Sequence, residues 1–269
     1  MALGIIVCGA GGRMGRTLIN LATQAAETKL VGAVEAPGLA TIGRDAGEIA
    51  GVGVLHVPIV DSLDKCIRSD AVTLDFTNSA AAVAHLRTAV QHQAPIVIGS
   101  TGYTPPEQAE LERLAPQTRT VIAPNMSVGI NVLLQLVRQA AQTLGPDFDP
   151  EIVEIHHKMK VDAPSGTALK LGRTVAEALG RDFEKSAVFG RQGLTGQRRQ
   201  NEIGMMTLRG GDAVDDHTVM FVGFGERIEL THRSQSRDCL ARGALRAALW
   251  LITQPPGRYD MTDVLELKS

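Results

Sequence analysis

Short apolar runs alternate with amphipathic segments through the first half of the chain. Residues 3–8 (LGIIVC) have the continuous apolar character of a buried strand, and residues 14–26 place apolar side chains on one side of a helix. Strands and helices that alternate in this way predict a parallel, doubly wound sheet. Further strands are expected at residues 30–35, 72–76, 95–99 and 120–123, and helices at 79–90 and from Thr104 onward.

After Asn125 the order of apolar runs and amphipathic segments differs from that of the first half. Residues 128–144 predict a long helix, residues 152–157 a strand, and residues 165–179 a helix capped by Ser165 and ended by Gly180. The short turn between the last two of the strand-like runs that follow favours an antiparallel or mixed sheet. Those runs lie at 203–209, 217–223 and 226–232, and a helical pattern returns at 237–252.

Composition narrows the class of protein. The 269 residues suffice for one large domain or two ordinary ones, and a hydrophobic content of 44% is near the globular average. The apolar runs are too short to span a bilayer, and the N-terminal segment does not resemble a secretory signal. The three cysteines have neither metal nor disulfide spacing, and the net charge is −2 without a basic block. We therefore expect a cytoplasmic protein that binds neither membrane nor nucleic acid.

A glycine-rich turn, GAGGRMG, lies between the first strand and the first helix. Gly9, Gly12 and Gly15 follow a looser spacing than the strict dinucleotide fingerprint. Glycines let a backbone approach phosphates closely, and the N–H groups at a helix N-terminus bind them. Glu35 ends the second strand 20 residues after Gly15, where it can bind ribose hydroxyls. A tight structural turn and a solvated charge are the alternatives, but the two features together favour a dinucleotide site.

Two further segments follow expected strands, at the edge where parallel sheets bind ligands. They are GSTG at residues 99–102 and APNMS at residues 123–127. On the sequence alone, each is equally well explained as an ordinary connection between a strand and a helix.

The segment EIHHKMKVDAPSGTA, residues 154–168, carries the most chemistry. His exchanges protons near neutral pH, Lys supplies a cation or an acid, and Ser165, Gly166 and Thr167 offer donors for a carboxylate. Because adjacent strand residues face opposite ways, His156 and His157 serve one site only if the strand ends or bends there. Otherwise one of them is structural. Adjacent histidines with no nearby cysteine lack metal-ligand spacing, so no metal is expected.

These segments resemble the dihydrodipicolinate reductase family over essentially the whole chain. GAGGRMG, GSTGY, APNMSVGIN, EIHHKMKVDAPSGTA and RGGDAVDDHTVMFVGFGERIELTHRSQSR occur in that family's order, and HHxxKxDAPSGTA is the most specific element. The resemblance implies NADH- or NADPH-dependent reduction of 4-hydroxy-tetrahydrodipicolinate to tetrahydrodipicolinate in lysine and diaminopimelate biosynthesis. It also implies a Rossmann-type nucleotide domain of residues 1–127 and 237–269, and an α+β substrate domain of residues 128–236. The open mixed sheet of that second domain would assemble homotetramers.

The resemblance also implies roles for individual residues. His156 and Lys160 would form the catalytic acid/base pair, and His157, Gly166 and Thr167 would bind a substrate carboxylate beside Ser165. Independently of the resemblance, Arg237 is a weaker candidate for the second carboxylate, because it lies where the chain returns to the first domain. A surface Arg that caps the start of the last helix explains it equally well. The nucleotide would contact Gly9, Ala10, Gly11, Gly12, Arg13, Met14, Glu35, Gly99, Ser100, Thr101, Ala123, Pro124, Asn125 and Met126.

The chain departs from many relatives directly after Glu35. Those relatives carry an Arg there that can contact the 2′-phosphate of NADPH, whereas this chain has Ala36. A preference for NADPH is therefore less expected here.

Two other functions remain open from the residues alone. A dehydrogenase of another amino-acid-like substrate, such as aspartate, would keep the glycine turn but would not explain HHxxKxDAPSGT. A non-catalytic dinucleotide sensor would be expected to carry a DNA-binding module or a basic face, and the sequence shows neither.

Overall fold

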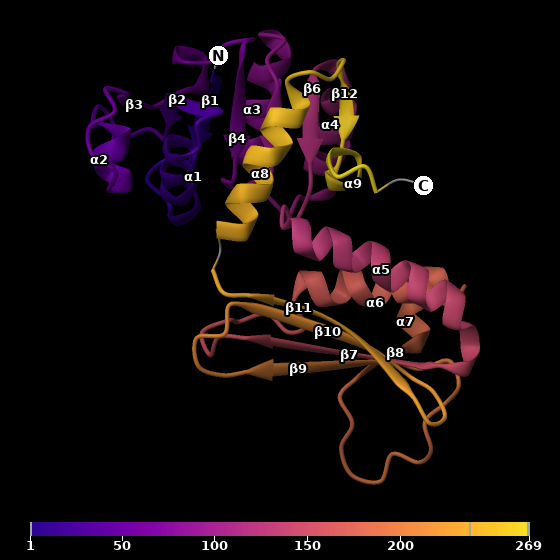
Figure 1. Ribbon diagram of the computed structural model, residues 1–269. Helices are drawn as coiled ribbons and strands as arrows, with labels where there is room; N and C mark the ends of the chain where they lie inside the picture. Colours follow the sequence, from indigo (N-terminus) through magenta and orange to yellow (C-terminus); the bar gives the residue numbers. More distant parts are fainter. Residues whose placement is uncertain (1, 237, 268–269) are drawn as a thin grey trace. The chain divides into compact units, whose positions relative to one another are not determined.

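The computed structural model describes residues 2–236 and 238–267 (Figure 1). The chain divides into two compact units: the first ends at Val128 and resumes at Asp238, and the second begins at Gly129. Each unit has a sheet and a hydrophobic core of its own. Within the described residues, no helix is long and apolar enough to cross a membrane.

The first unit is a doubly wound sheet in which every strand pairing is parallel, in the order β12-β6-β5-β4-β1-β2-β3. Alternate residues of β1 enter different cores, with Ile5 and Val7 on one face and Ile6 and Cys8 on the other. This explains why the strand is apolar throughout. The strands are β1 (Leu3–Cys8), β2 (Thr28–Val34), β3 (Ile59–Val60), β4 (Ala71–Asp75), β5 (Ile96–Ile98), β6 (Arg119–Ile122) and β12 (Gly257–Tyr259).

Helices cover both faces of this sheet. α1 (Arg13–Gln24) and α8 (Asp238–Leu251) pack together in one core, and α3 (Ser79–Gln91) and α4 (Pro105–Leu114) pack in another. The expected parallel, doubly wound architecture is confirmed. The sequence pattern missed β3 and β12, because they are too short to show a period and neither is a run of three apolar residues like β5. The short helices α2 (Ala46–Ala50) and α9 (Met261–Val264) were missed for the same reason.

The second unit has a mixed five-stranded sheet in the order β11-β10-β7-β9-β8. β10 pairs antiparallel with β7 and β11, whereas β9 pairs parallel with β7 and β8, so the expected mixed sheet is confirmed. α5 (Val128–Leu144), α6 (Gly166–Ala178) and α7 (Phe183–Ser186) supply the helices of this unit. The strands are β7 (Asp149–His156), β8 (Ala187–Phe189), β9 (Ile203–Arg209), β10 (Asp215–Val222) and β11 (Arg227–Ser234).

The helices α5 and α6 cover one face of this second sheet. Ile130, Ile152, Leu171 and Phe221 are buried together there. The short β8 was not expected, and β10 begins two residues before the run that the sequence marked at 217–223. This earlier start brings Asp215 into the sheet.

Candidate active site

The glycine-rich turn joins β1 to α1 and is shaped by close backbone contacts. Gly9 has a φ of +75°, and a Cβ at Gly15 would lie 2.1 Å from the Gly9 carbonyl oxygen, so a side chain at either position is strongly disfavoured. α1 begins at Arg13 with no side-chain cap on its first N–H groups. Glu35 accepts a hydrogen bond from the Gly11 N–H at 2.8 Å. The turn, the helix N-terminus and this carboxylate therefore meet at one edge of the sheet.

A cavity of about 480 Å³ opens beside this turn, within the first unit. Gly12, Glu35, Thr77 and His85 contribute to its lining, and its volume is in the range of small-molecule sites. Next to it, buried Asp75 accepts hydrogen bonds from the Thr77 N–H at 2.9 Å and the Thr77 hydroxyl at 2.7 Å, and it faces the His85 Nδ1 at 2.5 Å. Burial raises the pKa of Asp75, but hydrogen bonds from His85 and Thr77 outweigh it and the net direction is downward.

Residues 99–101 follow β5 at the same edge. A Cβ at Gly99 would lie 2.2 Å from the Phe76 ring, so only glycine fits there. The Ser100 hydroxyl donates to Asp75 Oδ1 at 3.1 Å, while Thr101 is exposed. Ser100 therefore orients this turn through a buried carboxylate.

Residues 123–126 follow β6, the neighbour of β5. Asn125 Oδ1 accepts a hydrogen bond from the Ser127 N–H at 2.9 Å, and Met126 is buried. A Cβ at Gly243 of α8 would lie 1.7 Å from the Met126 carbonyl oxygen. α8 thus fixes the path of this turn. The three segments expected to bind nucleotide all follow β1, β5 or β6, whose carboxyl ends share one sheet edge.

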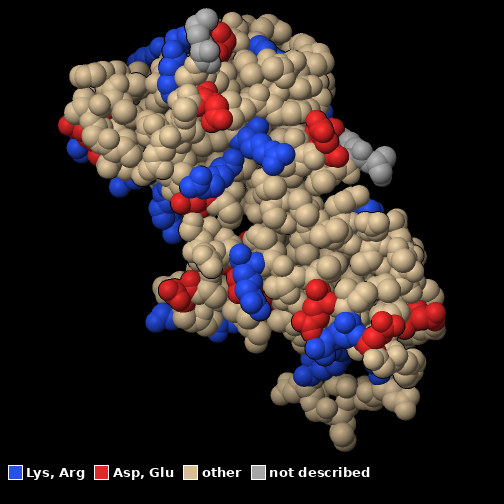
Figure 2. Space-filling model, viewed as in Figure 1, with Lys and Arg blue, Asp and Glu red and all other residues tan. Residues whose placement is uncertain are grey.

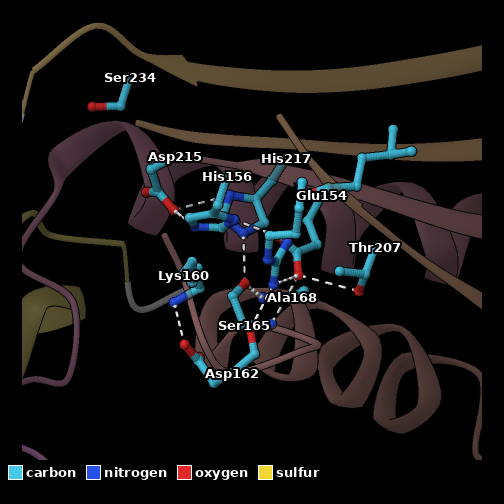
Figure 3. Close-up of polar contacts among 12 residues, drawn as sticks. Glu154, His156, Lys160, Asp162, Ser165, Ala168, Thr207, Asp215, His217 and Ser234 are labelled. Carbon is cyan, nitrogen blue, oxygen red and sulfur yellow. Dashed lines mark hydrogen bonds and ion pairs between the residues drawn. The ribbon is translucent and has the colours of Figure 1, made fainter. Parts of the chain in front are cut away.

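The histidine-containing segment lies in the second unit, where strand register gathers its side chains (Figure 3). Glu154 and His156 alternate on β7 and are both buried on the helix-covered face. Residues paired across neighbouring strands lie about 5 Å apart, which brings side chains of β9 and β10 to the same place. We call the resulting set the buried polar cluster: Glu154, His156, Thr207, Arg209, Asp215 and His217.

Glu154 is the acceptor at the centre of this cluster and is only 1% exposed. Its carboxylate accepts hydrogen bonds from the Arg209 guanidinium at 3.0 and 3.1 Å, from the Ser165 N–H at 3.0 Å and from the Thr207 hydroxyl at 3.2 Å. It also faces the His156 Nδ1. Burial raises the pKa of Glu154, but the bonds from Arg209, Ser165 and His156 outweigh it, so the net direction is downward. The carboxylate is therefore ionised at neutral pH.

His156 and His217 have opposite surroundings. The His156 ring lies between two carboxylates, with Nδ1 toward Glu154 and Nε2 2.9 Å from Asp215 Oδ1. His217 is fully enclosed, and burial lowers its pKa to about 4, so it is neutral at pH 7. Its Nε2 lies 3.1 Å from the Ser165 hydroxyl, which also caps α6. The cluster thereby holds the first turn of α6 in place.

The chain leaves β7 directly after His156. His157 lies outside the strand, so the condition under which both histidines can serve one site is met. The Lys160 N–H donates to the His157 carbonyl at 3.0 Å, and the Lys160 ammonium lies 2.8 Å from Asp162 Oδ1. Gly166 and Thr167 are the first residues of α6. The other carboxylate candidate, Arg237, lies outside the described residues.

Two groups in the second unit have the donor set of a metal site. The ligand atoms of Glu154, His156 and His217 lie within 4.8 Å of one another, and so do those of Asp215, His217 and His232. Spacing along the sequence does not indicate these groups, because strand pairing brings their residues together. The expected absence of a metal stays a prediction.

Several residues of the site were missed from the sequence. Asp75 is the last residue of β4, whereas Glu35 directly follows β2. Period-two alternation along β7 puts Glu154 on the face of His156, and this signal was readable in the sequence. Asp215 and His217 come from a strand about 60 residues further along the chain, at register positions that no local pattern specifies.

A doubly wound sheet with a glycine turn, joined to a mixed-sheet unit with a histidine cluster, is the arrangement of a two-domain, nucleotide-dependent oxidoreductase. Comparison with known proteins narrows this class. The family described as "Dihydrodipicolinate reductase, N-terminus" matches residues 3–126, and "Dihydrodipicolinate reductase, C-terminus" matches residues 129–265. The chain therefore belongs to the dihydrodipicolinate reductase family.

Individual relatives support this assignment to the family. The chain is 52% identical to the 4-hydroxy-tetrahydrodipicolinate reductase of Pelobacter propionicus and 51% identical to that of Geobacter sulfurreducens, over 98% of this chain and 99% of each relative. The fold matches the solved structure of a dipicolinate-bound dihydrodipicolinate reductase from Paenisporosarcina sp. TG-14, with a TM-score of 0.76 and 22% identity over 98% of this chain and 99% of that one. The expected activity is thus confirmed at the level of the family, an NAD(P)H-dependent reductase of lysine and diaminopimelate biosynthesis.

Proposed function

We propose that this chain reduces 4-hydroxy-tetrahydrodipicolinate to tetrahydrodipicolinate, with NADH or NADPH held by the first unit and the dicarboxylate by the second. One observation carries the proposal: the family matches cover both units and include the HHKMKVDAPSGTA segment, whose Ser165 and His156 are tied into the buried polar cluster. A dehydrogenase of another amino-acid-like substrate has no comparable support from these residues.

The first unit suits a dinucleotide. The close contact between Gly9 and Gly15 and the uncapped start of α1 leave backbone N–H groups for a pyrophosphate. Glu35, at the cavity wall, is placed for ribose hydroxyls. The turns at 99–101 and 123–126 would complete the nucleotide site. A bound nicotinamide nucleotide would supply the hydride.

The second unit suits a carboxylate. Gly166 and Thr167 open α6, where N–H groups and the positive end of the helix dipole attract an anion. Ser165 holds that first turn through His217, and His157 follows the last residue of β7. We assign these residues to one carboxylate of the substrate. His156 and Lys160 remain the candidates to protonate the enamine carbon of the reduced ring.

The cofactor preference follows from Glu35 and its neighbour. The Glu35 carboxylate can accept hydrogen bonds from ribose hydroxyls but repels a 2′-phosphate, and Ala36 brings no cation to offset that repulsion. Arg16 donates to the Gly11 carbonyl at 2.9 Å, which keeps its side chain at the glycine turn. We propose that NADH is used at least as well as NADPH.

We propose a cytoplasmic homotetramer that binds neither nucleic acid nor membrane. The face of the second sheet away from the helices carries exposed apolar side chains such as Leu208 and Val222, which further copies of the chain would bury. On the face visible in Figure 2, acidic and basic side chains are interspersed over the described residues, unlike a nucleic-acid-binding stripe. Light scattering of the purified protein measures the mass that tests this assembly.

A coupled assay tests the activity. Pyruvate and aspartate semialdehyde are converted by the preceding synthase, and the oxidation of NADH or NADPH is followed after this chain is added. We expect oxidation only when both precursors and the synthase are present. Aspartate with NAD⁺ serves as the substrate of the rival dehydrogenase. Nucleotide binding without oxidation of the synthase product would refute the proposed function.

A further inference from the structure

Two buried imidazole nitrogens in the second unit lack a hydrogen-bond partner among the residues that the structure describes. They are Nδ1 of His217 and Nδ1 of His232. The side chain of His217 is fully buried, so bulk water does not reach it. A buried polar atom without a partner in the protein points to a water molecule or an ion at that position.

Strand register brings a carboxylate to these two rings. His217 of β10 and His232 of β11 are paired directly in the antiparallel register, so their side chains lie on the same face of the sheet. Asp215 precedes His217 by two residues on β10 and therefore shares that face. Its Oδ1 lies 3.6 Å from His217 Nδ1, too far for a hydrogen bond (Figure 3). The ligand-type atoms of all three residues lie within 4.8 Å of one another.

The other nitrogen of His217 is already engaged. Its Nε2 lies 3.1 Å from the Ser165 hydroxyl oxygen, which also accepts a hydrogen bond from the Ala168 N–H. The tautomer that carries its proton on Nε2 donates to this oxygen and leaves a lone pair on Nδ1, on the side of Asp215. Histidines that ligate metal ions commonly donate a hydrogen bond from their second nitrogen in this way, which fixes the orientation of the ring.

The donor set favours one class of ion. Two imidazole nitrogens and a carboxylate oxygen form the protein part of open zinc sites, in which water takes the fourth position. Mg²⁺ and Ca²⁺ prefer sites made of oxygen ligands. Ligand atoms around a tetrahedral zinc ion lie about 3.4 Å apart, close to the observed separation of Asp215 Oδ1 and His217 Nδ1. The Asp215 side chain is 22% exposed, so an ion can enter from its side.

We infer that Asp215, His217 and His232 form a binding site for one divalent transition-metal ion of the zinc class, with water in the fourth position. The inference goes beyond the proposed function and does not depend on it. Asp215 Oδ1 also lies 2.9 Å from His156 Nε2, so a bound ion competes with His156 for this oxygen. For the second unit this inference replaces the expectation of a metal-free protein, which rested on spacing along the sequence.

Two other groups within the described residues bring ligand-type atoms equally close: Glu154, His156 and His217, and, in the first unit, Cys8, Asp75 and His85. Their carboxylates are already occupied. Both Glu154 oxygens accept hydrogen bonds from Arg209, and Asp75 accepts two from Thr77 and one from Ser100. The orphaned nitrogens of His217 and His232 therefore make the group with Asp215 the stronger site.

The test is calorimetric titration of the full-length protein with Zn²⁺, after treatment with a chelator and dialysis. We expect one Zn²⁺ per chain, and His232→Gln should raise the Kd for Zn²⁺ at least about tenfold, since even a residue that only hydrogen-bonds to a ligand contributes that much. Asp215→Asn should have the same effect. His92→Gln is the matched control, because His92 also faces a carboxylate, that of Asp64 at 3.5 Å, but on the surface; its Kd should equal that of the wild type.

Two further measurements make the test specific. His232→Asp keeps an oxygen at the δ position, where His232 has its buried Nδ1, and should recover most of the affinity for Zn²⁺. Co²⁺ in place of Zn²⁺ should give the strong visible absorption of a four-coordinate site, and Mg²⁺ should not bind. Circular dichroism confirms that each variant is folded.

Three results would overturn the inference. The first is a wild-type protein that binds no Zn²⁺, in which case water satisfies the orphaned nitrogens. The second is an unchanged Kd for Zn²⁺ in both His232→Gln and Asp215→Asn. The third is a loss of affinity in His156→Gln or Cys8→Ser as large as that in His232→Gln, because the ion would then be held by one of the other two groups.

Discussion

Glu154→Gln removes one negative charge from the centre of the buried polar cluster and keeps the shape of the side chain. Donors surround this carboxylate: the Arg209 guanidinium, the Ser165 N–H and the His156 ring. A Gln amide can accept some of these bonds through its oxygen, but its NH₂ group must face other donors. The Arg209 cation would then be left without its carboxylate in a largely buried position.

The size of the effect follows from burial. The Glu154 side chain is 1% exposed, and breaking a buried ion pair by changing one partner costs about 3–5 kcal/mol of stability. Glu177 provides the matched control in the same unit, because it also pairs with an arginine, Arg138, at 2.9 Å but is 63% exposed. An exposed pair of this kind contributes about 0.2–1 kcal/mol, so Glu177→Gln should be nearly neutral.

The effect should also depend on pH in a defined direction. The pKa of Glu154 is lowered in the folded protein. Its stabilising contribution is therefore complete above the unfolded value of about 4.3 and is lost as the pH falls through the folded value. The difference between wild type and Glu154→Gln should be largest at pH 7 and shrink in acid, because the wild-type carboxylate is then protonated too.

Urea denaturation at pH 7 and pH 3.5, with hydrogen exchange read at the amides of β7, measures this difference in the second unit. We expect the loss at pH 7 to exceed that of Glu177→Gln by at least about 2 kcal/mol. If the two variants lose the same stability at pH 7, Glu154 does not hold the cluster together and the reasoning is wrong.

Three further predictions concern the proposed nucleotide site and the proposed role of Lys160. Ala36→Arg should raise kcat/KM for NADPH relative to NADH by about tenfold, the ratio that ~1.4 kcal/mol represents. The reason is that the guanidinium can pair with the 2′-phosphate beside Glu35. An unchanged ratio of kcat/KM values would contradict this prediction. Lys160→Ala should lower kcat or raise the substrate KM by at least about tenfold with the Kd for NADH unchanged, and wild-type kinetics would remove Lys160 from the site. Gly243→Ala should destabilise the first unit by about 1–3 kcal/mol in thermal denaturation and weaken NADH binding, because the added Cβ would lie 1.7 Å from the Met126 carbonyl oxygen. Helix propensity alone predicts a gain in stability instead. Such a gain would show that α8 can shift to accommodate the methyl group.

The sequence predicted the first unit well because its signals are local. A buried strand such as β1 is apolar throughout, and the glycine turn after it follows from backbone contacts within a few residues, such as that of Gly15 with Gly9. Chain order then implies the sheet edge, since parallel strands joined by helices have their carboxyl ends together. The strands that were missed, β3, β8 and β12, have only two or three residues each.

Only part of the buried polar cluster in the second unit could be predicted from the sequence. Alternation along β7 puts Glu154 and His156 on one face, and the end of that strand separates His157 from it. Which side chains meet His156 from other strands depends on register, and a slip of one residue would replace Asp215 with Asp216 and turn its carboxylate to the opposite face.

The sequence by itself thus determined the class of fold, the glycine-rich turn and the motifs of the family, because each is encoded in neighbouring positions. Only the tertiary structure decided that Asp215 and Glu154 enclose His156, that His217 is buried and neutral, and that Gly243 supports the turn at Met126. Those contacts join residues up to about 120 positions apart, and they form only when packing and strand register are fixed for the whole sheet.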